Sequence, residues 1–89
     1  KLYTTNDIGV VLAGWAKGTH TKEDYDLIIS ELVGDSTAAN PEKTVQTNAK
    51  SQAKAVYQAA TAAERKRLGE IIKELFGLTD KDLQKWLEK

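Results

Sequence analysis

The chain has 89 residues, enough for one domain with a single modest core, and its 13 basic side chains are balanced by 13 acidic ones. Zero net charge excludes the strongly basic class of nucleic-acid-binding domains. Because cysteine is absent, disulfides, thiolate metal sites and cysteine nucleophiles are excluded, which favours a cytoplasmic location over that of a processed, secreted chain.

The sequence also lacks methionine, even at position 1, so we expect a processed chain or an excised piece of a longer protein. No apolar run approaches the roughly 18 residues of a membrane span, and no signal-peptide pattern is present. We therefore expect residues 1–89 to form a single helical domain without a membrane partner.

Two helices are predicted in the first third of the chain, at about residues 5–17 and 22–33. Each follows a capping threonine that has an aspartate three residues later, the two members of a capping box. Apolar residues then recur at every third or fourth position, and a glycine, Gly18 or Gly34, ends each helix. The short linker between them predicts an angular or antiparallel pair.

A third helix is predicted at about residues 41–59, after Asn40 as the capping residue. Its apolar stripe is thin, because most of its members are alanine: Val45, Ala49, Ala53, Val56 and Ala60. On the opposite side Lys43, Lys50 and Lys54 fall within about 40° of one another, and Tyr57 lies beside them. These residue types suit phosphate contact and base stacking, although the solvated face of an amphipathic helix has the same pattern.

A fourth helix is predicted at about residues 62–76 and a fifth at about residues 80–88. The fourth begins at the capping box of Thr61 and Glu64, and its first turns carry Arg65, Lys66 and Arg67. Residues 43–67 thus hold six basic side chains and one acidic one, a local positive patch. No strand pattern or repeat is present. The fold class is therefore all-α, a compact orthogonal bundle of about five short helices whose core comes mainly from helices 1, 2 and 4.

The sharpest local pattern is the run FGLTDKDLQKW within residues 73–87. Gly77 suits the left-handed residue that ends a helix, and Thr79 with Asp82 suits the start of the next one. This order of apolar residue, glycine, apolar residue, threonine and two further spaced apolar residues resembles the helix-turn-helix of DNA-binding domains. The resemblance implies that the last helix enters the major groove and offers Thr79, Lys81, Gln84 and Lys85 to phosphates and base edges.

Two features depart from the helix-turn-helix pattern. Lys73 stands where the motif usually has a small residue, and the last helix carries the acidic residues Asp80, Asp82 and Glu88, which repel phosphates. The alternative interpretation is that a glycine and a capping threonine simply join two packed helices.

Catalytic and metal sites are not indicated. The acids Glu23, Asp24 and Asp26 lie in the first turn of a helix, where the dipole favours them, and the spacing of an EF-hand is absent. His20 is the only histidine, and neither a cysteine nor a serine-centred motif accompanies it. We therefore expect a non-enzyme without a metal or another cofactor.

Two functions remain open from the sequence. The first is a small nucleic-acid-binding or regulatory domain with DNA as its partner, whose contact residues are Lys43, Lys50, Lys54, Tyr57, Arg65, Lys66, Arg67, Thr79, Lys81, Gln84 and Lys85. The second is a protein-interaction module, an adaptor or inhibitor, that docks through an exposed Tyr57 and the alanine-rich face of the third helix. Zero net charge favours the second function, and the turn motif and the lysines favour the first.

Overall fold

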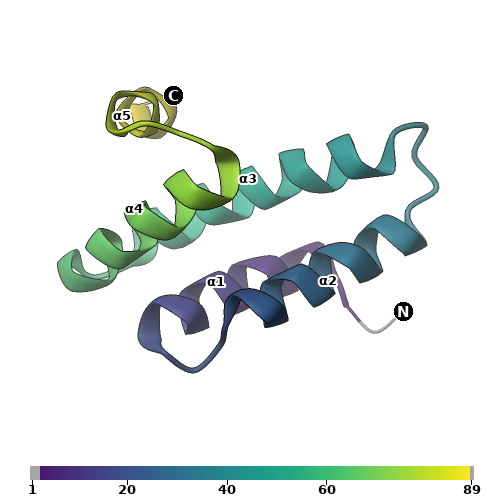
Figure 1. The fold of residues 1–89 in the computed structure, drawn as a ribbon, viewed down its shortest axis with the longest axis horizontal. Coiled ribbons are helices and arrows are strands. Elements are labelled where there is room, and N and C mark those ends of the chain that lie inside the picture. The colour runs from purple at the N-terminus through teal and green to yellow at the C-terminus, as the bar shows by residue number, and fades with distance from the viewer. Residues whose placement is uncertain (1–2, 89) are drawn as a thin grey trace.

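The computed structural model describes residues 3–88, which form five helices and no strand (Figure 1). The helices are α1 (Thr5–Lys17), α2 (Lys22–Asp35), α3 (Pro41–Ala59), α4 (Ala62–Phe76) and α5 (Asp80–Glu88). The predicted all-α bundle is confirmed. Within residues 3–88, none of these helices combines the length and the apolar character that crossing a bilayer requires.

Local capping interactions set most of the helix ends. The backbone N–H of Asp24 donates to the hydroxyl of Thr21 at the start of α2, and the same arrangement starts α4 and α5. Gly18 ends α1 with a left-handed φ of 89°. The predicted end of α2 is wrong, because Gly34 has no positive φ and the helix continues to Asp35.

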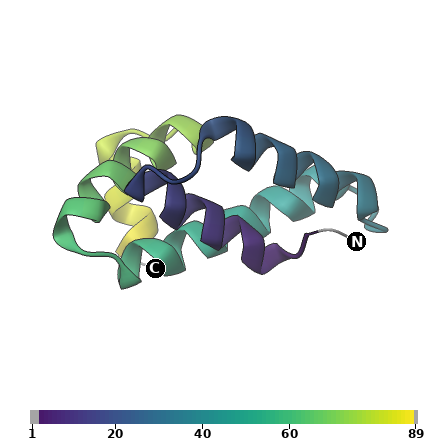
Figure 2. The same cartoon turned by 90° about the horizontal axis from the view of Figure 1, so that it is seen from below.

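Four helices run back and forth along the long axis of the molecule, and α5 crosses them (Figure 1). Figures 1 and 2 together show two layers, with α1 and α2 in one and α3 and α4 in the other. The orthogonal element of the bundle is α5, which is seen nearly end-on in Figure 1 above α3 and α4. Helix α5 packs mainly against α4, which itself packs against α3.

The core is centred on α1, which packs against α2, α3 and α4 and most extensively against α3. Ile8, Leu12, Leu68 and Ile72 are the largest side chains that are fully buried. Helices α1, α2 and α4 supply most of the buried apolar side chains, as expected, and Ala49 and Ala53 on the predicted apolar stripe of α3 are also fully buried. Small side chains let α3 approach α1 closely, and a Cβ added at Gly9 would lie 2.6 Å from Oε1 of Gln52.

Tyr25 is the one core residue with an unsatisfied polar atom. Its ring is 4% exposed and lies against Trp15, with ring centroids 6.2 Å apart. Its hydroxyl is the only buried side-chain nitrogen or oxygen within residues 3–88 that has no hydrogen-bond partner. Burial raises the pKa of Tyr25 to about 12, and the negative charge of Asp26 adds to the effect.

Tyr25→Phe should therefore raise the free energy of unfolding by about 1 kcal/mol, since it removes a desolvated hydroxyl and keeps the ring. In the wild type the raised pKa also makes stability depend on pH. The hydroxyl stays protonated in the folded state and ionises near pH 10 in the unfolded state, so stability falls as pH rises from about 10 to 12.

Urea unfolding at neutral pH and at about pH 11 measures both effects of Tyr25→Phe. The variant should have the higher midpoint at neutral pH and should lose less stability at alkaline pH than the wild type. Tyr57→Phe is the matched control, because Tyr57 is only half-buried. A lower midpoint for Tyr25→Phe would show that the hydroxyl contributes to stability instead.

Candidate nucleic-acid interface

The lysines of α3 have no acidic partner. Lys43 and Lys50 are exposed and Lys54 is half-buried. Within residues 3–88 every salt bridge lies elsewhere, one joining Lys22 to Asp26 and two joining Lys73 to acids of α4 and α5. The charges on α3 are therefore available to an external anion.

Aromatic rings lie beside this row of lysines. Nζ of Lys50 is 5.7 Å from the centroid of the Phe76 ring, close enough for a cation–π contact. Phe76 lies in turn against Trp86 of α5, with ring centroids 6.5 Å apart and planes inclined by 52°. The lysine row thus borders the place where α3, α4 and α5 meet. Sequence reasoning missed Phe76 and Trp86 as its neighbours, because both fit the apolar stripes of their own helices.

Tyr57 is not the exposed aromatic that the sequence suggested. Its side chain is half-buried and packs against the core, near Gly69 of α4. Arg65 covers the ring, with its guanidinium carbon 5.6 Å from the centroid. Ala49 and Ala53 are also fully buried, so neither alanine lies on the surface of α3.

Arg65 holds the connection between α3 and α4. Its Nε donates to the carbonyl oxygen of Tyr57 at 2.9 Å, and its Nη2 donates to the carbonyl oxygen of Gln58 at 2.8 Å. These carbonyls belong to the last turn of α3, where the helix leaves carbonyl groups short of partners, and that of Tyr57 also accepts from the N–H of Ala60 at 3.3 Å. Arg65 therefore acts mainly as a C-terminal cap of α3.

Arg65, Lys66 and Arg67 do not form one patch. All three are exposed, but consecutive helical residues point about 100° apart, so only one of them can face α3. That residue is Arg65, as its hydrogen bonds show. Lys66 and Arg67 consequently point in other directions around α4 than Arg65 does.

The turn between α4 and α5 has the predicted backbone. Gly77 has a left-handed φ of 64°, and the N–H of Leu78 donates to the carbonyl oxygen of Lys73 at 2.9 Å, as in a Schellman motif. The N–H and hydroxyl of Thr79 are both engaged with Asp82. The backbone N–H of Thr79, which donates to the Asp82 carboxylate, and then the Thr79 side chain hold the pKa of that carboxyl below its usual range. Thr79 is thus committed to capping α5.

Lys73 occupies the position where a small residue usually stands in a helix-turn-helix. Its ammonium bridges Glu70 of α4 and Asp80 of α5, and these hydrogen bonds, with that to Asp80 first, raise the pKa of Lys73. The lysine therefore joins the two helices through a salt bridge across the turn.

The outer face of α5 carries no excess of positive charge. Lys81, Gln84 and Lys85 are exposed as the helix-turn-helix resemblance requires. Residues 80–88, however, contain two lysines and three acids, a net charge of −1, whereas residues 41–59 contain three lysines and one acid, a net charge of +2. Electrostatics consequently favours α3 over α5 as the surface that meets phosphates.

Within residues 3–88 no three His, Asp or Glu side chains lie together in a group that could hold a metal ion. His20 packs over Gly14 of α1, and its Nδ1 lies 3.2 Å from the hydroxyl of Thr19.

Comparison of the chain with protein-family models, curated proteins and solved structures found no match.

Proposed function

We propose that the protein is a non-catalytic module that binds nucleic acid through the phosphate backbone, using Lys43, Lys50 and Lys54 of α3. The observation that carries this proposal is the absence of any acidic partner for these lysines among the salt bridges of residues 3–88. No acidic residue lies between Lys43 and Ala63, so Glu42 is the one acid of α3 that repels a phosphate.

The spacing of the lysines suits a polyanion. With a rise of about 1.5 Å per residue, Lys50 and Lys54 lie about 6 Å apart along α3, and Lys43 lies about 10 Å further on. A row of this length spans several phosphates of a single strand, whose axial spacing in a duplex is about 3.4 Å. Binding of this kind reads the backbone and tolerates many base sequences.

The charges of the remaining helices support α3 as the contact surface. The first turn of α2 is acidic, and Glu74 of α4 lies close enough to contribute, after Asp26 and Glu23, to the raised pKa of Lys22. Acidic groups therefore gather around α2 and the end of α4. We expect α5 to play at most a secondary part because of its own acids.

The test is the salt dependence of DNA binding. If three lysines each displace a counterion, the slope of log K against log salt is about −2.7 for duplex DNA, so affinity falls about 40-fold between 50 and 200 mM salt. Lys50→Gln with Lys54→Gln should leave a slope of about −0.9 and a loss of only about 3- to 4-fold over the same range. Fluorescence anisotropy with a labelled generic duplex measures both.

Lys81→Gln with Lys85→Gln on α5 is the matched control, because it removes the same charge from another helix. We expect this variant to keep the wild-type slope. If it flattens the slope and the α3 variant does not, the helix-turn-helix contact replaces the α3 contact. If the wild type shows no binding at about 50 mM salt, where electrostatic contacts are strong, the nucleic-acid proposal is rejected.

A further inference from the structure

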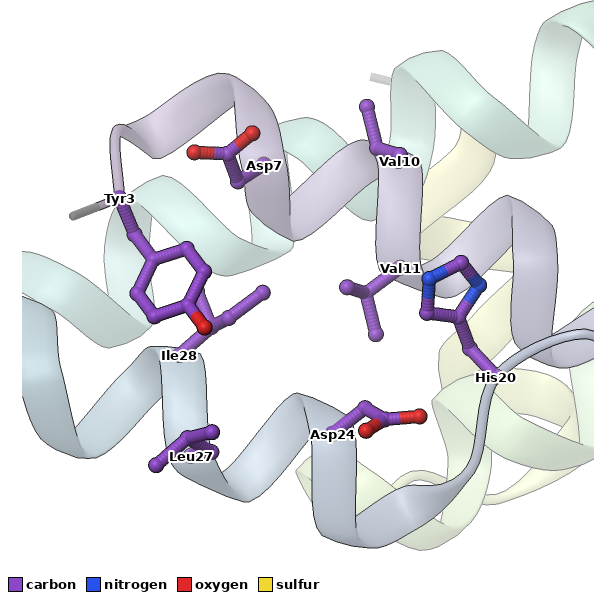
Figure 3. A pocket seen from close by; sticks show the side chains of 8 residues that line it. All are labelled: Tyr3, Asp7, Val10, Val11, His20, Asp24, Leu27 and Ile28. Carbon is purple, nitrogen blue, oxygen red and sulfur yellow. The ribbon is translucent and has the colours of Figure 1, made fainter.

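A groove lies between α1 and α2, on the side of this pair that faces away from the other helices (Figure 3). It encloses about 250 Å³. Its floor is apolar and formed by the buried Val11 and Ile28. The ring of Tyr3 lies at one end and the imidazole of His20 at the other (Figure 3).

The rims of the groove hold exposed apolar side chains. Val10 on α1 is 60% exposed and Leu27 on α2 is 51% exposed. They are the only exposed large hydrophobic residues within residues 3–88, and both line this one groove. A single exposed apolar side chain is common on a protein surface. Two exposed apolar side chains that line the same groove, above an apolar floor, indicate an interaction surface.

The two rims repeat one another. A shift of 17 positions along the chain relates Asp7, Val10 and Val11 of α1 to Asp24, Leu27 and Ile28 of α2. The lining residues at the two ends, Tyr3 and His20, have the same separation. Because α1 and α2 run antiparallel, the two sets are related by an approximate two-fold rotation (Figure 3). Each rim therefore offers one carboxylate and one exposed apolar side chain.

The charge of this face decides what can cover it. Among the described residues that line the groove, two are acids, Asp7 and Asp24, and none is a lysine or arginine. A second copy of the chain, packed groove to groove, would bring these acids together, which is unfavourable. A partner with apolar residues along its centre and lysine or arginine along both edges matches the floor, the rims and the carboxylates at once.

We propose that the α1–α2 groove docks an amphipathic basic helix of a partner protein. An apolar ridge of that helix covers Val11 and Ile28, and basic side chains on its two edges approach Asp7 and Asp24. The approximate two-fold symmetry of the groove is the reason that both edges, and not one, carry positive charge. This surface lies in the α1–α2 layer. Whether it binds a partner helix is therefore independent of whether α3 binds nucleic acid.

The experiment uses two synthetic 14-residue helical peptides that share a leucine ridge, one with lysine and the other with glutamate along both edges. Each is titrated into isotope-labelled protein and followed by two-dimensional NMR. The lysine peptide should give saturable shift changes at Val10, Val11, Leu27 and Ile28, and the glutamate peptide should give none.

Val10→Ser with Leu27→Ser should weaken the lysine peptide about tenfold or more, because it removes the two exposed anchors and leaves every charge in place. Thr47→Ala with Ser51→Ala, at exposed positions of α3, should leave its affinity unchanged. The proposal is overturned by equal binding of the glutamate peptide, by shifts outside the groove, or by no saturable change up to about millimolar peptide. It is also overturned if sedimentation shows that the protein alone dimerises and the serine variant does not.

Discussion

Leu12→Ala should lower the free energy of unfolding by about 2–5 kcal/mol, enough to remove much of the stability of a domain of this size. Leu12 is 0% exposed and belongs to the core cluster, together with residues of α2, α3 and α4. Truncation to alanine therefore loses the stabilisation from burying the leucine side chain. It also leaves a cavity in the core that the surrounding helices can fill only partly. Ile72→Ala should act similarly, since Ile72 is also fully buried.

Urea unfolding measures this effect as a lower midpoint with an unchanged slope. Val10→Ala is the matched control, because it shortens an apolar residue on the same helix where the side chain is already in water. We expect the control to be neutral or slightly stabilising, since alanine has the higher helix propensity. Unchanged midpoints for both Leu12→Ala and Ile72→Ala would contradict the arrangement of the core.

Ala53→Leu should also be strongly destabilising, by about 1–3 kcal/mol, although it adds apolar surface. Ala53 is fully buried in the core, on the helix that packs most extensively against α1. The two helices lie close together next to this position, since a Cβ added at Gly9 of α1 would meet both Gln52 and Val56 of α3. A larger residue therefore forces α1 and α3 apart.

Thermal unfolding checks this prediction, because a loss of 1 kcal/mol lowers the melting temperature of a domain of this size by about 4–8 °C. Ala55→Leu is the control, since Ala55 lies two residues away on the exposed side of α3. We expect the control to melt close to the wild type. Equal melting temperatures for Ala53→Leu and Ala55→Leu would contradict the close packing of α1 against α3.

Much of the helical structure was predictable because it depends on neighbours in sequence. Thr21 with Asp24 and Thr79 with Asp82 form their capping hydrogen bonds three residues apart, whatever the rest of the chain does. Gly77 ends α4 by a backbone conformation that other residues adopt only with strain. The predicted end of α2 at Gly34 was wrong because a glycine can also continue a helix. Gly34 does so, without the positive φ of a helix-ending glycine.

The candidate interface was only partly predictable. The lysine row of α3 follows from helical periodicity, because the three side chains belong to one helix. The absence of salt-bridge partners for these lysines does not follow from periodicity, since it depends on where α2, α4 and α5 place their carboxylates. In the same way, the covering of Tyr57 by Arg65 joins two helices across a bend, and periodicity assigns no partner to either residue.

By itself, then, the sequence determined which segments are helical, where most of them begin and end, and which face of each is apolar, because those properties arise within about one helical turn. Only the tertiary structure decided how those faces are used. It buried the alanines of α3 against the rest of the core, turned Tyr57 inward, and brought Asp7 and Asp24 to opposite rims of one groove. The physical reason is that packing between helices joins residues distant in sequence, and no local pattern records which helix will be the neighbour.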